Sequence, residues 1–316
     1  MIKNFFIIDG MSLCARSHFA NPLLRSSSGL SSGCIYGFFN SLKSLKKKYP
    51  QFHFYIAWDS YAKRKRKIYA QYKAFRPKLS LDLQVFDIRS ILSCLNVSQA
   101  FCEGEEGDDV IASLVEQFKK NNPEVLIYIL SSDKDMLQLV EKTVVVISPG
   151  KGGEEKAYDA EAVKEKFGVY PENFALFQAF RGDKIDNVPG IKNLPSKVIT
   201  DLVGKYKTLD LIFSSVNNEE LTKFQNNAIL SSEKQIYINY ELVKLSRSLD
   251  LSIIDGKPET KQINNLLKKY EIEKISADQL TKIFESESGF PFRTAPQIES
   301  YNLFEEGEII DEEKIV

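Results

Sequence analysis

This chain of 316 residues is poor in the residues that most often mark zinc-binding and disulfide-bonded proteins. It has only four cysteines and two histidines, and none of them forms a CxxC or HxxxH pattern. A zinc site is therefore not expected, and we interpret the cysteines as small buried residues in a reducing compartment. No apolar run is long enough to span a bilayer and no secretory leader is evident, so we expect a cytoplasmic protein without a membrane partner.

The net charge of the chain is also small. The formal value is −1, so the overall charge indicates nothing about nucleic acid. The local distribution is more informative, because residues 63–78 hold eight Lys or Arg and no acid, with aromatic residues interleaved. Basic side chains neutralise phosphates and aromatic rings stack on unpaired bases, so this run predicts a nucleic-acid contact. The alternative is an ordinary solvated helix face.

Nine acidic residues stand at positions that are hard to explain as ordinary surface. Two of them end apolar runs and the others form three short clusters: Asp9, Asp59, Glu106, Asp108, Asp109, Asp133, Asp135, Asp183 and Asp186. Carboxylates that converge repel one another unless cations offset their charge, and oxygen ligands suit Mg²⁺ or Mn²⁺. The set predicts metal-dependent phosphate chemistry. For any single acid, the alternative is a helix cap or a polar turn.

Hydrophobic patterning predicts an α/β fold. The predicted strands are 4–8, 52–58 and 125–130, and the predicted helices between them are 35–48 and 108–120. The strand segments are largely apolar rather than alternating, which is typical of parallel strands buried on both faces. A β-α-β-α-β order predicts a doubly wound sheet, in which ligands bind beyond the carboxyl ends of the strands. Asp9, Asp59 and Asp133 are therefore expected to converge.

The second half of the chain is predicted to be mainly helical. One helix opens at residues 170–173 and runs to about Arg181, and another lies near 196–205. A glycine-containing loop between two helices can present backbone N–H groups to a phosphate. Lys192 and Lys197 flank this turn. The hairpin alone is weak evidence, because any pair of helices needs a turn.

Several motifs, in this order along the chain, resemble a known family. Residues 104–114, 132–139 and 182–190 are similar to segments of the 5′-nuclease domain of bacterial DNA polymerase I, of phage 5′-exonucleases and of flap endonucleases. Ile8-Asp9-Gly10, Tyr36-Gly37-Phe38 and Tyr72-Lys73 with Arg76 fit the same order, over roughly residues 1–250. The resemblance implies a 5′→3′ exonuclease and flap endonuclease that hydrolyses DNA to 5′-phosphate products in replication or repair.

The resemblance also implies an architecture. It predicts a PIN-like α/β domain, with a doubly wound, mainly parallel sheet, over residues 1–170 and a helical arch over about 60–85. A helical domain with a helix–three-turn–helix motif that grips duplex DNA is expected over 171–284. Residues 285–316 are expected to form an acidic tail, and no polymerase domain is expected.

Residue roles carried over from the family divide the acids into two groups. One metal would be held by Asp9, Asp59, Glu106 and Asp108, with Asp109 in or just behind that set; the second by Asp133, Asp135, Asp183 and Asp186. The resemblance implies two or more Mg²⁺ ions, for which Mn²⁺ would substitute. Lys73 and Arg76 would act on the scissile phosphate. The implied nucleic-acid contacts are Arg16, Tyr72, Lys65 or Arg66, Lys192 and Lys197.

One departure from the family pattern affects a further ion. The family has Gly-Ile-Gly, often around a bound K⁺, where this chain has Asn193-Leu194-Pro195. Asn tolerates left-handed backbone, but Pro195 fixes φ and removes a donor N–H. The substitution argues against a K⁺ site in this turn.

The expected partners are DNA with 5′ ends or flaps and RNA primers, bound by a monomer. Residues 297–304 are similar to sliding-clamp-binding peptides, and six acids follow among 305–313. The alternative for this segment is a solubilising tail. Two other functions remain open: a catalytically silent DNA-structure-binding protein, and a ribonuclease of the related PIN-like fold.

Overall fold

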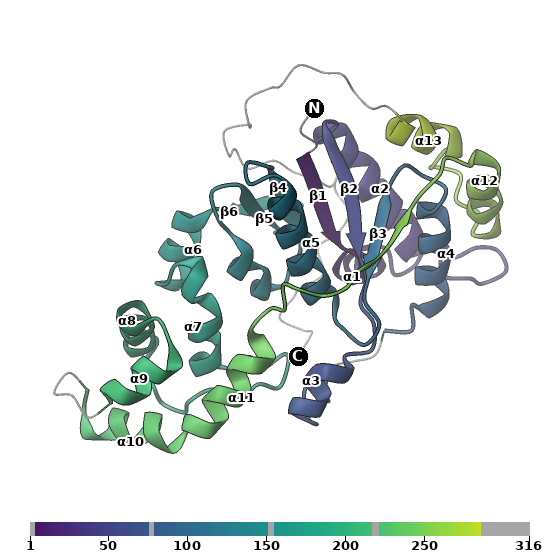
Figure 1. Ribbon diagram of the computed structural model, residues 1–316. Helices are drawn as coiled ribbons and strands as arrows, with labels where there is room; N and C mark the ends of the chain where they lie inside the picture. The colour runs from purple at the N-terminus through teal and green to yellow at the C-terminus, as the bar shows by residue number, and fades with distance from the viewer. Residues whose placement is uncertain (1–3, 76–78, 151–154, 217–220, 286–316) are drawn as a thin grey trace.

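The computed structural model describes residues 4–75, 79–150, 155–216 and 221–285. Its centre is a seven-stranded sheet in the order β6-β5-β4-β1-β2-β3-β7 (Figure 1). The strands are β1 (Asn4–Asp9), β2 (Phe52–Ala57), β3 (Ser98–Phe101), β4 (Ile127–Leu130), β5 (Val144–Pro149), β6 (Glu155–Tyr158) and β7 (Ser252–Asp255). All pairs from β5 to β3 are parallel, and only β6 and β7 run antiparallel to their neighbours. The predicted doubly wound, mainly parallel sheet is confirmed.

Apolar side chains on both faces explain why the central strands are buried. In β1, Phe6 and Ile8 point to one face and Ile7 points to the other, and all three have no exposed surface. Successive side chains of a strand face opposite ways, so a continuous apolar run fills two cores rather than one. The absence of alternation in the sequence was the correct signal for this position in the fold.

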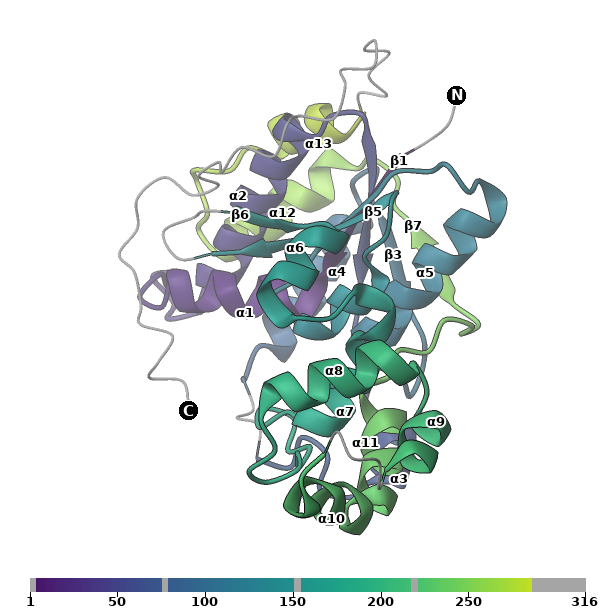
Figure 2. The ribbon, with the colours of Figure 1, turned by 90° about the vertical axis from the view of Figure 1, so that its left-hand side faces the viewer.

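Helices cover each face of the sheet. On one face lie α1 (Gly10–Ala20), α2 (Gly33–Lys48), α4 (Asp82–Leu92), α12 (Thr260–Lys269) and α13 (Ala277–Glu285). On the other face lies α5 (Gly107–Asn121), and the core on this face continues into the helical half of the molecule. The helices of that half between residues 174 and 243 lie below the sheet in Figure 2. The two halves therefore share one hydrophobic core.

The helical half follows β6. It contains α6 (Ala160–Phe167), α7 (Phe174–Arg181), α8 (Ser196–Tyr206), α9 (Leu209–Ser215), α10 (Lys223–Ser231) and α11 (Glu233–Val243), and the short 3₁₀ helix η3 (Pro171–Asn173) leads into α7. Another 3₁₀ helix, η1 (Lys134–Leu139), lies between β4 and β5. The helices predicted up to Arg181 and near 196–205 are confirmed as α7 and α8. The loop that joins them carries Asp183 and Asp186.

The chain then returns to the sheet, which corrects the expected helical unit over 171–284. After α11 it forms β7, which pairs with β3 so that Ile253 lies opposite Ala100. Helices α12 and α13 follow and pack on the same face as α2 and α4. β7 has four residues, of which only Ile253 and Ile254 are apolar and both are partly exposed, so its apolar signal is shorter than that of the buried strands.

The described residues of the expected arch, about 60–85, form only short helical segments. Residues Lys63–Ile68 form the short helix α3, which lies beside α11 in both views (Figures 1 and 2). Residues 76–78, including Arg76, lie outside the described part of the chain, as do 286–316 with the clamp-like segment 297–304.

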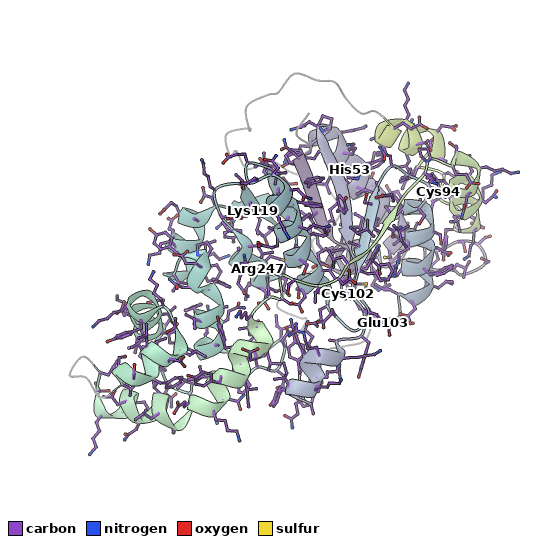
Figure 3. All side chains as sticks on the ribbon, in the orientation of Figure 1. His53, Cys94, Cys102, Glu103, Lys119 and Arg247 are labelled. Carbon is purple, nitrogen blue, oxygen red and sulfur yellow. The ribbon has the colours of Figure 1, made fainter. Side chains whose placement is uncertain are left out.

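The structure bears on two further features, membrane-spanning helices and the state of the cysteines. Within the described ranges, no helix is both long and apolar enough to cross a membrane. The four cysteines are free, and Cys94 and Cys102 lie well apart (Figure 3).

Candidate metal centre and nucleic-acid interface

Asp9 and Asp133 lie at the edge where the strand order reverses. β1 and β4 are parallel neighbours with Ile8 opposite Leu130, so the residues that follow them meet at one edge. Asp9 caps α1 by accepting a hydrogen bond from the Ser12 N–H at 2.9 Å, and its other oxygen accepts one from the Ser131 hydroxyl at 2.8 Å. Burial, together with the nearby Asp59 and Asp133, raises the pKa of Asp9 to about 7. The structure thus confirms the predicted convergence at the switch point of the sheet.

The start of α5 brings further acids to the same place. Asp59, which follows β2, accepts a hydrogen bond from the N–H of Gly107. A Cβ on Gly107 would lie 2.9 Å from Asp59 Oδ1, so the close approach requires glycine. Asp108 is buried, and burial together with Asp133 raises its pKa well above the usual range. Burial and a neighbouring carboxylate both disfavour the charged form of Asp108.

Asp133 and Asp135 open the 3₁₀ helix η1. Asp133 accepts a hydrogen bond from the Asp135 N–H at 2.9 Å. The Asp135 carboxylate is buried and accepts a hydrogen bond from Gln178 on α7. Burial and the neighbouring Asp133 raise the pKa of Asp135 well above normal. Asp135 therefore lies where the sheet half meets the helical half.

Asp183 and Asp186 reach the same junction from the loop after α7. The two ends of this loop lie close together. A Cβ on Gly182, whose φ is +76°, would lie 2.2 Å from the Gly190 N. Asp183 accepts a hydrogen bond from the Ile185 N–H at 2.8 Å. Asp186 is buried, and its Oδ2 lies 3.3 Å from the Tyr72 hydroxyl. The second group of acids thus depends on how the two halves meet.

Two lysines of the basic run lie among the acids. The Lys73 ammonium is 2.6 Å from Glu106 Oε1 and 3.5 Å from Asp186 Oδ2, so it joins the two halves. The Lys65 ammonium is 2.9 Å from Glu106 Oε2 and its side chain is 1% exposed. Although burial disfavours a charged Glu106, Lys65 and Lys73 lower its pKa to about 2. In the described ranges no three acidic, His or Cys side chains form a ready metal-ligand set, and these two ammonium groups occupy both oxygens of Glu106.

Lys65, Tyr72 and Asp109, three of the predicted site residues, are buried in the structure. Lys65 and Tyr72 were expected to contact nucleic acid, but they are 1% and 2% exposed. The Tyr72 hydroxyl instead donates to Glu106 at 2.9 Å, because the acids attract the polar ends of this segment inward. Asp109 was expected in or just behind the first metal set, and its oxygens face Arg64 and the Ser246 N–H. Of the pair left open, Arg66 is the one towards solvent, with its guanidinium 5.1 Å from the Tyr61 ring.

The remaining basic residues lie at the periphery. Arg16, on α1, lines a small pocket with Ser12 and Ser131 beside Asp9. Lys192, in the turn between α7 and α8, and Lys197, in the first turn of α8, are exposed, and Lys197 pairs with Asp201 at 2.6 Å. These positions suit contacts with a large anionic partner, and the roles of these residues stay predictions.

Sequence reasoning missed two polar residues that organise the acids. Ser131 holds Asp9, and Gln178 holds Asp135. Gln178 is buried in the otherwise apolar stretch of α7, and a lone polar residue there was an available signal. Ser131 offered a weaker one, since serine is common in turns.

The comparisons with known proteins agree with this geometry. Residues 4–168 match the 5′-3′ exonuclease N-terminal resolvase-like domain, and residues 169–266 match the 5′-3′ exonuclease C-terminal SAM fold. The chain belongs to the 5′-3′ exonuclease family. It is a nuclease, and the predicted family resemblance, fold class and 5′-nuclease function in replication or repair are confirmed.

Several relatives share most of the chain. A 5′-3′ exonuclease of Aquifex aeolicus is 36% identical over 91% of this chain and 98% of its own length. A DNA polymerase I of Caldicellulosiruptor bescii is 37% identical over 67% of this chain but only 25% of its own length. Among solved structures, the flap endonuclease of bacteriophage T5 has a TM-score of 0.63 and 18% identity over 90% of this chain and 100% of that one. Flap endonuclease-1 of Methanococcus jannaschii has a TM-score of 0.55 and 14% identity over 90% and 94%. At these identities the structures support the fold.

Proposed function

We propose that this family member is a divalent-metal-dependent 5′→3′ exonuclease and flap endonuclease that acts on DNA 5′ ends and flaps, with Mg²⁺ as its metal. The observation that carries the proposal is the convergence of acids from β1, β4, α5 and the loop after α7, with Lys73 between them. A T5 flap endonuclease structure is described as a complex with DNA and metal ions, and another T5 structure as binding zinc. The fold match makes the same partners reasonable here.

The donor set fits hard divalent cations. Its members are carboxylates only, and burial and neighbouring carboxylates raise the pKa values of Asp9, Asp108 and Asp135. Mg²⁺ and Mn²⁺ prefer such oxygen ligands. We assign one group to Asp9, Asp59, Glu106 and Asp108 and the other to Asp133, Asp135, Asp183 and Asp186. Bound ions would compete with Lys65 and Lys73 for these carboxylates. The turn at Asn193 and Pro195 argues against K⁺.

The chain's own residues explain how a phosphodiester would be handled. Lys73 can exchange its ion pair with Glu106 for one with the scissile phosphate, because its side chain is 10% exposed at the rim of the acids. Arg76 follows it in the sequence and is assigned the same phosphate. The hairpin with Lys192 and Lys197 would hold the duplex beside the cleaved strand. When bound, the metal ions would supply positive charge that stabilises the negative charge developing on the phosphate oxygens.

A labelled 5′-flap duplex tests the proposal. Incubation with Mg²⁺ should release the flap and leave a 5′-phosphate, and a chelator should stop cleavage without abolishing DNA binding. Binding without cleavage at any Mg²⁺ concentration would favour the silent DNA-structure-binding alternative. Cleavage of single-stranded RNA but not of the flap would favour the PIN-like ribonuclease.

A second candidate function concerns residues 297–304, which lie outside the described part of the chain. The Gln297 and Leu303-Phe304 pattern supports binding to a sliding clamp. A peptide of residues 294–308 should bind a cognate clamp, and the variant with Leu303→Ala and Phe304→Ala should bind more weakly. Lack of binding by the wild-type peptide would remove this idea. We further propose that the enzyme acts as a cytoplasmic monomer and accepts RNA primers.

A further inference from the structure

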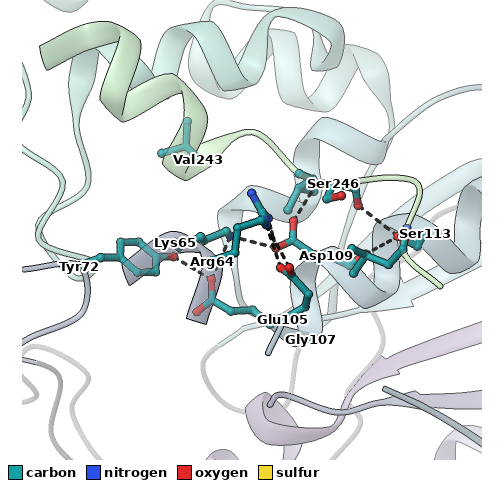
Figure 4. A network of polar contacts seen from close by, with 12 residues as sticks. Arg64, Lys65, Tyr72, Glu105, Gly107, Asp109, Ser113, Val243 and Ser246 are labelled. Carbon is teal, nitrogen blue, oxygen red and sulfur yellow. Dashed lines mark hydrogen bonds and ion pairs between the residues drawn. The ribbon is translucent and has the colours of Figure 1, made fainter. Parts of the chain in front are cut away.

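The carboxylate of Asp109 has a set of partners that differs from those of the other acids. Its side chain has no exposed surface. Its Oδ2 lies 2.9 Å from Arg64 Nη2 and 3.4 Å from the Lys65 ammonium, both on α3. Its Oδ1 accepts a hydrogen bond of 2.7 Å from the Ser246 N–H, beyond the end of α11. Both oxygens are therefore occupied by partners from two distant segments (Figure 4).

Further contacts from α5 and η1 hold the segment that follows α11. Ser113, one turn after Asp109 on α5, lies 3.3 Å from the Ser246 carbonyl, and its hydroxyl accepts a hydrogen bond of 3.1 Å from the Leu249 N–H. Gln138 binds the start of the segment, since its amide group donates to the Val243 carbonyl at 2.8 Å. Arg247, labelled in Figure 3, donates to the Gln138 carbonyl at 2.9 Å. Residues 243–249 are thus fixed to the sheet half.

Helix geometry separates Asp109 from its neighbour Asp108. Successive residues of an α-helix point about 100° apart around the axis. The electrostatic neighbours of Asp108 include Asp133 and Asp9, which places it on the metal side. Asp109 faces α3 and the segment after α11 instead. A buried carboxylate paired with a guanidinium and a backbone N–H already has the compensation that a metal ion would supply.

We propose that Asp109 is a positioning residue and not a metal ligand. Its contacts with Arg64, Lys65 and Ser246, which we call the tie, join the base of α3 to the segment that leaves the helical half. The tie thereby sets how residues 61–75 lie over the acids. This inference rests on the proposed nuclease function, because Lys65 and Lys73 belong to that segment. Lys65 links the two groups directly, since its ammonium lies between Glu106 and Asp109. Loss of the tie should therefore loosen the approach of Lys73 to the acids.

Three variants of the full-length chain test the tie: Asp109→Asn, Arg64→Met and their combination. The amide introduced by Asp109→Asn would leave only a neutral, weaker acceptor for the Ser246 N–H and would lose the charge that holds Arg64. Both single variants should increase amide hydrogen exchange in residues 61–75, and Asp109→Asn should also do so in 244–249. Arg64→Lys should restore part of the protection, because it keeps the charge. Lys63→Met is the matched control, since the neighbouring Lys63 pairs with exposed Glu103 outside the network.

Metal affinity, measured by calorimetry with Mn²⁺, distinguishes positioning from ligation. Asp109→Asn should bind within about twofold of wild type, while Asp108→Asn should lose roughly tenfold or more. An equal loss in the two variants would overturn the proposal, as would unchanged exchange in both segments. In single-turnover cleavage of a 5′ flap, both single variants should lower the rate constant more than the affinity, and the double variant should be no worse than the poorer single one. Fully additive losses would count against a shared tie.

The two proposals fail in different ways. If the wild-type protein neither cleaves DNA nor binds Mn²⁺, the proposed function fails, and hydrogen exchange alone still decides whether Asp109 holds α3. If wild type is active and the exchange pattern is unaffected, only the tie is wrong. If Asp109→Asn does not fold, Arg64→Met still decides the outcome, because Arg64 is partly exposed and its replacement leaves Asp109 with Ser246.

Discussion

At the scale of single residues, position relative to the acids separates roles that composition cannot. Lys65, Arg66 and Lys73 belong to one basic run, but Lys65 is fully buried, Arg66 faces Tyr61 and Lys73 bridges Glu106 and Asp186. The same charge is therefore a buried counter-ion at Lys65, stands over a surface ring at Arg66 and bridges two acids at Lys73. Of these three, only Lys73 is both paired with the acids and partly exposed.

Replacement of Lys73 by Ala is expected to lower single-turnover cleavage of a 5′ flap by on the order of 10²-fold, by analogy with the loss of an oxyanion donor. Flap binding should change little, because one cation among many contributes a small part of the affinity. Lys119→Ala, at the far end of α5, is the control (Figure 3). Equal losses in rate and affinity would make Lys73 a binding residue.

The variant with Asp133→Asn and Asp135→Asn should abolish cleavage while retaining flap binding. Both residues open η1 at the domain junction, and the amides would keep the local hydrogen bonds but not the charge. Rapid-quench cleavage and fluorescence anisotropy measure the two quantities, with exposed Asp278→Asn as the control. Surviving cleavage would show that the metal assignment is wrong.

The buried Lys46 should make the free energy of unfolding of this protein depend on pH. Its ammonium is buried and donates to the carbonyls of Pro50 and Phe52, and burial lowers its pKa to about 8 from the usual 10.5. Between these two values the unfolded chain binds more protons than the folded one, so folding becomes more favourable as pH rises. The cost of burying the charge is fully present below about pH 8 and is relieved towards pH 10.5.

Denaturant titrations at several pH values measure this effect. Relative to Lys46→Met, wild type should gain on the order of 2 kcal/mol in unfolding free energy between the two pKa values. The exposed neighbour Lys47→Met should show no such change relative to wild type. A difference that stays constant across this pH range would mean that Lys46 has an ordinary pKa.

At the scale of elements, the central strands of the sheet and β7, with which the chain returns to the sheet, differ in how well the sequence predicts them. β1, β2 and β4 were predictable because long apolar runs specify strands buried on both faces. β7 was not, because only two of its four residues are apolar and its pairing with β3 joins residues that are distant in sequence. Yet β7 directs α12 and α13 onto the core.

Phe284 on α13 should therefore matter for stability although no catalytic role is assigned to it. It is 1% exposed and meets Phe54 edge-on, with ring centroids 5.9 Å apart. Phe284→Ala should lower the unfolding free energy by about 3–5 kcal/mol through lost burial and the cavity left behind. Ile254→Ala on β7, where the side chain is 42% exposed, should cost less than about 1 kcal/mol. Equal costs would mean that α13 does not pack as described.

At the scale of the whole molecule, the two halves meet through both an apolar core and a polar junction. The core under α5 continues into the helices of the second half. At the junction, Tyr72 and Lys73 contact Glu106 on one side and Asp186 on the other. Asn239 on α11 donates to the carbonyls of Ala179 and Pro189, which fixes the loop that carries Asp186. The second acid group is thus a property of the assembled molecule.

Tyr72→Phe tests this junction. The hydroxyl is buried and donates to Glu106 or Asp186, so its removal should lower the unfolding free energy by about 1–2 kcal/mol. Hydrogen exchange should rise around residues 183–188. Tyr61→Phe, at a tyrosine that is 64% exposed, is the matched control. An unchanged exchange pattern would show that the hydroxyl does not hold the halves together.

The sequence by itself determined the central strands, the helices that follow them and the acids at the strand ends, because apolar periodicity and residue chemistry act over short stretches of chain. Only the tertiary structure decided that Tyr72 points inward, that Asp109 faces away from the other acids, and that the chain returns to the sheet at β7. Tyr72 meets partners 34 and 114 residues away. Such pairings depend on how whole faces pack, and a local pattern does not encode which of several similar side chains will reach a distant partner.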